Sequence, residues 1–433
     1  MRDLLFTNDR RGEYPPSYYA ATANPLDPQP IAKGAIKADV VVIGAGFTGL
    51  SATLHLAQAG LDVVLLDAQR VGFGASGRNG GQIASGQRQE QDELEELVGR
   101  EDALKLWNIA QEANQLVRDL SQDMKDASVK DGIIHACHRK RYVAHEHHYA
   151  EKMARDYGYE KIKPLGRDEL YHLCASPRYH GGALDMGAGH IHPLNFALGL
   201  GRKCLAAGAR IFENSKVLRV EEGAQVKVTT DRATITGKHV LYACNGYLGN
   251  LNGNVAKRVM PINNFILATE PLDKATRDGI LKNDHAVADS KFVVNYFRFS
   301  DDHRMLFGGS ESYGYKFPKN IEAAVRRPME HIFPQLKDVR ADYAWGGTLA
   351  ITMQRLPYFA RLAPNILNAS GYSGSGGAMA TMGGKLSAMA IQGQMEKFDV
   401  MSRIPTVRFP GGPAFREPLL VAAMLWYQLR DAF

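Results

Sequence analysis

The sequence predicts an α/β fold with an added part in which helices and strands are mixed. A β-branched run, a glycine-rich turn, an amphipathic helix and a second apolar strand follow one another over residues 39–67. Further along the chain, strand-like and helical segments alternate without forming a repeat. At 433 residues, with 45% hydrophobic and 23% charged residues, the chain has the composition of a globular protein and the length of two or three domains.

The segment 39–67 predicts a dinucleotide-binding βαβ unit. Residues 40–43 suit a buried parallel strand, and Gly44, Gly46 and Gly49 form the spacing GxGxxG directly after it. In this motif the glycines allow a tight turn, close approach of the backbone to a pyrophosphate, and close packing of helix on strand. Asp67 ends the second strand, where its carboxylate can accept hydrogen bonds from ribose hydroxyls and would repel the 2′-phosphate of NADP.

The next segment favours FAD over NAD as the dinucleotide. Residues 71–82 hold five glycines where an NAD-binding domain would place its second crossover helix. Such a loop offers bare N–H groups, together with the side chains of Ser76, Arg78, Asn79 and Gln82, to a large polar group. A flavin mononucleotide half fits this description, and an ordinary surface loop is the alternative.

Composition argues against several other classes of protein. The net charge of +6 is small for this length, and the basic run 138–141 is interpreted as a solvated strand end, so no nucleic-acid partner is expected. The four cysteines form no CxxC pair, which is typical of reduced thiols in the cytosol. The first 14 residues lack the apolar core of a signal peptide, and no apolar stretch approaches the roughly 20 residues of a membrane span. The histidines at 135–148 lack a metal-ligand spacing, so no metal is expected.

The remaining elements are predicted from periodicity and from turn residues. Residues 1–37 contain five prolines and are expected to form an extended arm. Helices are expected at 91–125, 147–157, 318–332 and 377–394. Strands are expected at 141–145, within 209–230, and at 239–244, 262–269, 291–299 and 304–309.

Three motifs together carry a family resemblance. The βαβ unit at 39–67, GASGRNGGQ at 74–82 and GYSGSGG at 371–377 resemble the D-amino-acid oxidase/glycine oxidase superfamily of FAD enzymes. The chain is most similar to the bacterial gamma-glutamylputrescine oxidase family, from about residue 17 to the C-terminus. Shorter segments that look similar are 17–21, 189–195, 244–248, 333–337, 355–357 and 409–412.

The resemblance implies a discontinuous Rossmann-like FAD-binding domain with an inserted α+β substrate domain built on a mixed sheet. The FAD-binding domain would comprise 38–100, 185–250 and 365–398, and the substrate domain 101–184 and 251–364. Residues 1–37 would be the N-terminal arm and 399–433 a C-terminal extension.

The resemblance also implies the residues that hold the FAD. They are Gly44, Gly46, Thr48, Gly49, Asp67, Ala68, Gly74, Ala75, Ser76, Asn79, Gly80, Gly81, Gln82, Val217, Cys244, Asn245, Gly371, Tyr372, Ser373, Gly374, Ser375 and Gly376. Members that tether FAD covalently use a cysteine before the last of these loops, and residues 350–362 contain none, so the flavin is expected to be non-covalent. Ser375 stands where relatives commonly have a histidine, which puts oxygen reactivity and substrate choice in doubt.

The substrate residues are predicted less sharply, because flavin amine oxidation leaves the difficult step to the cofactor. The protein must place a C–H bond over flavin N5, and no Ser–His–Asp triad is expected. Tyr247, Tyr296 and Trp345 are candidates for an aromatic cage around an alkyl-ammonium group, with core packing as the alternative role of each. Arg355 is a candidate to grip a substrate carboxylate, or else to form a structural salt bridge.

The expected function is oxidation of an amine such as gamma-glutamylputrescine, giving an imine, then an aldehyde, with O₂ reduced to H₂O₂. A first alternative is a D-amino-acid or N-methyl-amino-acid dehydrogenase of the same fold that uses an acceptor other than oxygen. A second is a protein that retains FAD as a structural ligand and acts through a partner. The sequence leaves the exact amine and the oligomeric state open.

Overall fold

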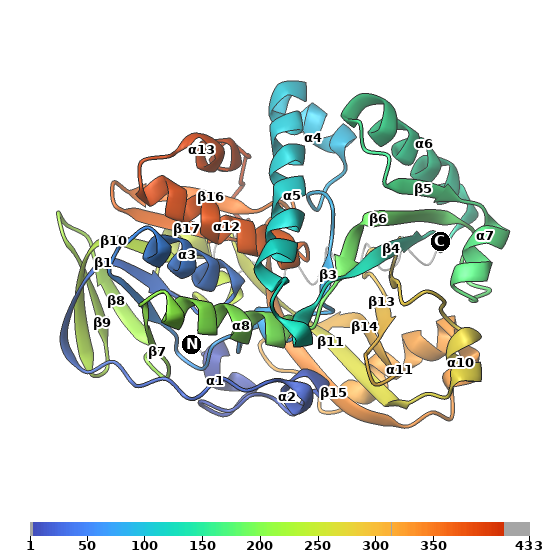
Figure 1. Cartoon of the computed structure of the whole chain (residues 1–433), viewed down its shortest axis with the longest axis horizontal. Coiled ribbons are helices and arrows are strands. Elements are labelled where there is room, and N and C mark those ends of the chain that lie inside the picture. The colour runs from blue at the N-terminus through green and yellow to red at the C-terminus, as the bar shows by residue number, and fades with distance from the viewer. Residues whose placement is uncertain (1–2, 313, 411–433) are drawn as a thin grey trace.

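Two large sheets organise the chain, which is described here by a computed structural model over residues 3–312 and 314–410. The first sheet has eight strands and occupies the left half of Figure 1, and the second has nine and occupies the right half. Both sheets are mixed, and each draws its strands from widely separated segments. The fold is therefore α/β with a discontinuous Rossmann-like part, as predicted.

The first sheet contains the predicted βαβ unit. Its main path runs β16 (Tyr358–Ala363), β17 (Ile366–Ser370), β10 (Ala233–Tyr242), β1 (Gly34–Ile43), β2 (Val63–Leu66) and β7 (Arg210–Phe212). The central pairs from β17 to β7 are parallel. An antiparallel hairpin, β8 (Val217–Glu221) and β9 (Val226–Thr230), joins the sheet through β10.

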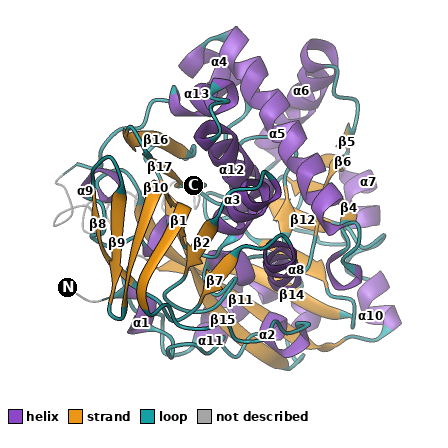
Figure 2. Ribbon diagram, turned by 60° about the vertical axis from the view of Figure 1, so that its left-hand side comes forward, coloured by secondary structure: helices purple, strands orange, loops and turns teal. Residues whose placement is uncertain are grey.

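Both faces of this sheet are buried, which explains its continuous apolar strands. Val40 and Val42 point to the face covered by α3 (Phe47–Gln58), α8 (Pro193–Ala206) and α12 (Gly376–Ile391), as Figure 2 shows for α3 and α12. Val41 and Ile43 point to the opposite face, where the β8–β9 hairpin packs. The alternation follows from the two-residue period of a strand.

The second sheet runs in the order β15 (Ala341–Ile351), β11 (Met260–Pro271), β14 (Arg304–Ser312), β13 (Tyr296–Phe299), β12 (Ala286–Asp289), β4 (Lys130–Ala136), β6 (Gly182–His190) and β3 (Gln82–Ile83), with β5 (Ile162–Leu165) beside β6. Helix α11 (Ile321–Ile332) covers β11 and β14, and α6 (Lys140–Tyr157) packs near β5 and β6. The remaining α-helices within the described residues are α4 (Gln91–Val98), α5 (Arg100–Ser121), α7 (Arg167–Leu173), α9 (Gly253–Ala256), α10 (Lys274–Asp278) and α13 (Glu396–Ser402). Short 3-10 helices are η1 (Ala75–Gly77), η2 (Lys125–Ala127), η3 (Asn245–Tyr247) and η4 (Pro334–Leu336).

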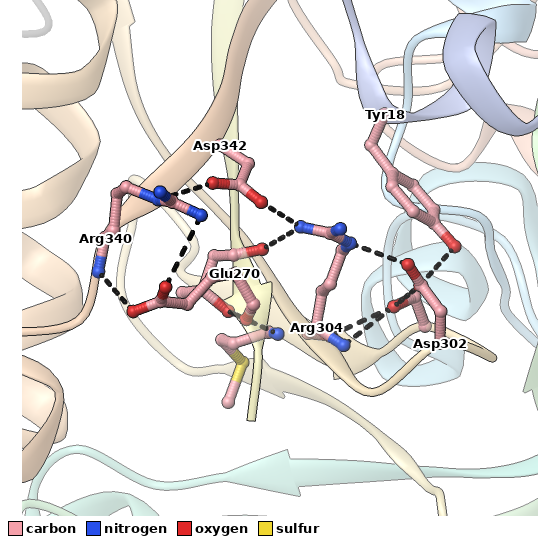
Figure 3. Close-up of polar contacts among 9 residues, drawn as sticks. Tyr18, Glu270, Asp302, Arg304, Arg340 and Asp342 are labelled. Atoms are coloured by element: carbon pink, nitrogen blue, oxygen red, sulfur yellow. Dashed lines mark hydrogen bonds and ion pairs between the residues drawn. The ribbon is translucent and has the colours of Figure 1, made fainter. Parts of the chain in front are cut away.

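The N-terminal arm is less extended than predicted. It contains two short helices, α1 (Leu4–Thr7) and α2 (Tyr18–Thr22), and runs along the lower edge of Figure 1 from the first-sheet half to β15. A network of charged side chains fastens α2 to the second sheet, because the Tyr18 hydroxyl donates to Asp302 at 2.7 Å (Figure 3). Asp302 accepts from Arg304, which also bonds Asp342. The network continues through Arg340 to Glu270 (Figure 3).

One predicted strand was wrong, and the predicted domain boundaries, which stay predictions, differ from the borders of the two sheets. The strand expected at 141–145 is part of α6, whose apolar side packs through Ala150 and Met153, so the basic run 138–141 leads into a helix rather than ending a strand. Packing of this amphipathic face overrides the β-branched Val143. Strands β3 and β6 belong to the second sheet, although residues 82–83 and 185–190 were assigned to the FAD-binding domain. Strand β16 belongs to the first sheet, although residues 358–363 were assigned to the substrate domain. Helix α13 crosses the boundary predicted at 398, and 411–433 of the C-terminal extension lie outside the described residues.

Two searches of the described residues were negative. No helix within 3–312 or 314–410 is both long and apolar enough to cross a membrane. Over the same residues, no group of three or more His, Cys, Asp or Glu side chains is arranged to hold a metal ion.

Candidate active site

A cavity of about 570 Å³ lies where the two sheets meet. Its walls include residues from the ends of β1, β2 and β10, from the loop 73–80, and from the turn before α12. In doubly wound sheets, ligands bind beyond the carboxyl ends of the strands. The other wall comes from the second sheet, so that one cavity joins both halves of the molecule.

The turn after β1 has the geometry of a pyrophosphate site. Gly44 has a left-handed φ of +106°, and a Cβ at Gly46 would lie 2.8 Å from the Ser76 hydroxyl. Helix α3 begins at Phe47 without a side-chain cap, and the Phe47 N–H donates to Ser76 Oγ at 2.9 Å. The start of α3 therefore presents backbone donors and a partial positive charge to a phosphate, in a cradle that a larger residue would fill.

Asp67 lies beyond this turn on the cavity wall, together with Gln69, Lys216 and Val217. Its carboxylate accepts hydrogen bonds from the N–H groups of Ala45 and Gln69, each at 2.7 Å. Burial raises the pKa of Asp67 to about 6, and these two bonds oppose the rise. We call this part of the cavity the adenosine end, because a carboxylate at this position of the motif binds ribose hydroxyls.

The loop 73–82 is held rigid by its own side chains. Asn79 donates to the carbonyls of Ala75 and Ser76 and accepts from the Gly81 N–H at 2.7 Å. Arg298 donates to the Gly80 carbonyl at 2.9 Å. Preorganised loops of this kind bind a cofactor with little loss of conformational entropy.

The segment before α12 closes the middle of the cavity. Ser375 is the N-cap residue of α12 and makes no capping hydrogen bond, so the helix start is open toward the cavity that Ser375 lines. Tyr372 bonds Thr48 of α3 at 2.7 Å, which joins the two helix starts. Cys244 points its Sγ at the Ile43 carbonyl at 3.3 Å, and burial raises the pKa of its thiol to about 12, so the thiol is not poised as a nucleophile.

Most of the residues predicted to bind the cofactor line this cavity. They are Gly44, Gly46, Thr48, Asp67, Ala68, Gly74, Ala75, Ser76, Asn79, Gly80, Gln82, Val217, Cys244, Asn245, Tyr372, Ser373, Gly374, Ser375 and Gly376. Three predicted glycines lie just behind the lining. A Cβ at Gly49 would lie 1.8 Å from the Gly44 carbonyl oxygen, Gly81 packs on Ile191, and the Gly371 N–H donates to Asn245.

Of the predicted substrate residues, Tyr247, Tyr296 and Arg355 line the cavity and Trp345 does not. Trp345 is only 2% exposed, packs edge-on against Tyr19, and donates its indole N–H to the Arg78 carbonyl at 3.0 Å. Trp345 therefore supports the loop 73–82, which we call the flavin-side loop, and does not take the predicted place in an aromatic cage, because strand alternation turns its side chain toward the arm.

The remainder of the lining was missed by the sequence analysis. Helices α5 and α6, strands β4 to β6 and the connection from α6 to β5 contribute Trp107, Ile133, His135, Glu146, Tyr149, Met153, Tyr159, Ile162 and Asp185. Loops and strands of the second sheet add Arg88, Asn264, Phe292 and Glu311. These residues come from segments far apart in the chain and share no motif, so no local signal could have found them. We call the first group the α6 wall.

Arg88 has an unusual environment. Within the described residues it forms neither a hydrogen bond nor an ion pair, and it lies beside Gly374 of the segment before α12. Burial lowers the pKa of Arg88, and the neighbouring charge of Arg355 lowers it further, while Glu311 opposes both. The Arg355 guanidinium stacks over Phe292 at 4.1 Å. Two partly buried cations facing a cavity favour a negatively charged ligand group.

Two curated relatives span nearly the whole chain. A probable oxidoreductase, OrdL, of Rhizobium meliloti is 42% identical over 96% of this chain and 97% of its own length. The gamma-glutamylputrescine oxidoreductase of Escherichia coli is 36% identical over 97% of this chain and 99% of its own length.

Solved structures share the fold at low sequence identity. Glycine oxidase from Geobacillus kaustophilus has a TM-score of 0.71 at 17% identity, covering 83% of this chain and 95% of that one. L-proline dehydrogenase from P. horikoshii has a TM-score of 0.72 at 20% identity, covering 85% of this chain and 98% of that one. Residues 39–390 match the family described as DAO, FAD dependent oxidoreductase, and they include the dinucleotide turn, the glycine-rich loop and the start of α12. The cradle described above fits the FAD of that family, and the chain is an FAD-dependent oxidoreductase that belongs to the DAO family.

Proposed function

We propose that this enzyme oxidises the primary amine of a compound whose other end is an amino acid, with gamma-glutamylputrescine as the best candidate. The observation that carries the proposal is the mixed charge of the substrate side of the cavity. Arg88 and Arg355 can hold a carboxylate, while Glu146 on the α6 wall has no ion-pair partner among the described residues and can hold an ammonium group. A glutamyl group carries both charges on one carbon.

The apolar part of the same wall suits the alkyl chain of such a substrate. Tyr149, Tyr159 and Trp107 line the cavity with aromatic side chains, and Met153 adds a flexible apolar side chain. Rings also favour an alkyl-ammonium group through cation–π attraction. A curated relative that shares 36% of its residues is named for gamma-glutamylputrescine, which agrees with this choice of substrate.

Residues of this chain would hold the FAD and position the amine, while the bound cofactor supplies the electron acceptor. Gly46, Ser76 and the start of α3 would hold the pyrophosphate, Asp67 the ribose, and the segment before α12 the flavin. Tyr296 donates to Asn264 at 2.5 Å, and burial raises its pKa far above the usual value, so it acts as a neutral positioning group and not as a base. Enclosure between the sheets would exclude water until the imine leaves.

In the proposed reaction the amine loses two electrons and two protons to become an imine. Water then hydrolyses the imine to an aldehyde and ammonia. Dioxygen takes the two electrons and two protons and becomes hydrogen peroxide. The FAD is proposed to be non-covalent, because Cys244 is the one cysteine on the cavity wall within the described residues and the raised pKa of its partly buried thiol keeps it protonated. A cytoplasmic location completes the proposal.

The decisive experiment is anaerobic mixing of purified holoenzyme with gamma-glutamylputrescine while the visible flavin band is recorded. Bleaching that reverses on admitting air supports both the amine and the oxidase. Bleaching that reverses only with a dye or quinone supports a dehydrogenase, the alternative that Ser375 keeps open.

Putrescine and N-acetylputrescine serve as matched controls, because they lack the amino-acid end. Absence of bleaching with all three compounds would overturn the proposed substrate class, and a flavin that no amine or D-amino acid reduces would favour a structural role for FAD.

A further inference from the structure

The N-terminal arm reaches the cofactor cavity. Leu5 lines the cavity at its adenosine end, beside Gln69 and Lys216. The family match begins only at residue 39, so this part of the wall is supplied by a segment outside it. A short apolar helix, α1, thus adds to a site whose other walls come from the dinucleotide-binding fold.

Gln69 ties the arm to the ribose-binding strand. It is fully buried two residues after Asp67, and both hydrogen bonds of its side-chain amide go to the arm. Its amide donates to the Leu5 carbonyl at 2.6 Å and accepts from the Gly12 N–H at 2.6 Å. A polar side chain buried in this way would leave unsatisfied groups if the arm detached.

A buried ion pair ties the arm to the flavin-side loop. Arg78 bonds both carboxylate oxygens of Asp9, at 2.9 and 3.0 Å, and the two side chains are 1% and 6% exposed. Arg78 also donates to the carbonyl of Phe73, at the other end of the loop that holds Ser76. Separation of such a pair leaves a buried charge uncompensated, so the loop and the arm are coupled.

Asp3 and Asn8 attach the arm at two further places. Asp3 pairs with Lys216, which lines the adenosine end. Asn8 donates to the Tyr315 carbonyl at 2.8 Å and accepts from the Phe317 N–H at 2.9 Å. The arm therefore spans from the adenosine end to the loop after β14, across both halves of the molecule.

We propose that residues 3–14 form a strap that completes the FAD site, covering its adenosine end and slowing release of the cofactor. The strap contacts Gln69, Arg78 and Lys216, which belong to or support the cofactor wall. Binding of FAD and closure of the strap then stabilise each other, and this coupling is reciprocal. The inference depends on FAD binding and does not depend on which amine is oxidised.

The test measures FAD affinity and release in full-length protein. Deflavinated enzyme is titrated with FAD, and release is followed by the fluorescence of free flavin. Asp9→Asn should speed release about tenfold by breaking the buried pair, and Leu5→Ala about threefold by removing an apolar contact. Arg10→Ala is the matched control, because its side chain is 86% exposed on the same segment, and its release rate should stay at the wild-type value.

Wild-type protein provides a second measurement that needs no variant. Trypsin can cut after Arg10 and Arg11, both inside the strap. If the coupling is real, saturating FAD slows cleavage there at least fivefold relative to apoenzyme, while cleavage after Lys274, which is 80% exposed on α10 and does not line the cavity, keeps its rate. Equal cleavage rates with and without FAD, or release rates of Leu5→Ala and a folded Asp9→Asn within about 1.5-fold of wild type, would overturn the strap.

Discussion

The proposed cofactor side and the proposed substrate side of the cavity are built in different ways. The cofactor side consists of backbone, glycines and helix starts in three short segments: 44–49, 74–82 and 371–377. The substrate side consists of side chains from at least five separated elements, among them Arg88, Glu146 and Tyr296. A site made of backbone groups tolerates few substitutions and suits a ligand that stays the same, such as a cofactor. The specificity of a site made of side chains can change one residue at a time. The difference predicts that variants on the two sides will separate cofactor binding from catalysis.

The largest effect is expected at Gly46. In Gly46→Val the new Cβ would lie 2.8 Å from Ser76 Oγ, in the space that a pyrophosphate needs. FAD content after purification should fall below about 1% of wild type, since a loss of more than about 3 kcal/mol in binding corresponds to over 100-fold. Gly253→Ala is the control, because a Cβ there meets nothing within 4 Å. Normal flavin content in Gly46→Val would show that the pyrophosphate lies elsewhere.

Arg88→Met should leave the cofactor side intact and impair the substrate side. Loss of a charge-assisted hydrogen bond of about 1.5–3 kcal/mol lowers kcat/KM for gamma-glutamylputrescine by roughly 10–100-fold. The same variant should change kcat/KM for N-acetylputrescine, which has no carboxylate, by less than about threefold. Arg219→Met, on an exposed side chain, is the matched control. Equal losses for both amines would mean that Arg88 acts on the flavin or the fold and not on a carboxylate.

The pH dependence of FAD binding tests Asp67. Its pKa is raised to about 6 by burial, above the unfolded value of about 3.9, so without FAD the protonated form is favoured below pH 6. Ribose hydroxyls that donate to the carboxylate favour the ionised form, so FAD binding releases a proton. FAD affinity should therefore rise about fivefold from pH 5 to pH 6 and about tenfold from pH 5 to pH 7, and level off above. Asp67→Asn should flatten this profile, and the exposed Glu96→Gln should keep it; a steep profile in Asp67→Asn would assign the proton to another group.

The same difference explains what could be predicted from sequence. Gly44, Gly46 and Asp67 stand at fixed spacings because one turn and one strand set their geometry, and nineteen of the cofactor residues implied by the family resemblance line the cavity. Arg88, Glu146 and Asn264 meet only through tertiary packing, so spacing carries no information about them. The strand expected at 141–145 failed for a related reason, since burial of Ala150 and Met153 along α6 depends on the second sheet.

Trp345 provides the smallest and most specific test of the comparison. The side chain lies behind the cofactor loop, so Trp345→Phe loses one hydrogen bond to the Arg78 carbonyl and keeps most of the packing against Tyr19. The free energy of unfolding should fall by about 1 kcal/mol, measured by chemical denaturation. Because Trp345 does not line the cavity, kcat/KM should stay within about twofold of wild type.

Tyr296→Phe is the partner variant. The Tyr296 hydroxyl bonds Asn264 on the cavity wall, so in this variant kcat/KM should fall by more than the stability of the fold does. A large loss of kcat/KM in Trp345→Phe at normal flavin content would return this ring to the substrate, and would mean that the two sides of the cavity are coupled through the loop that Trp345 supports.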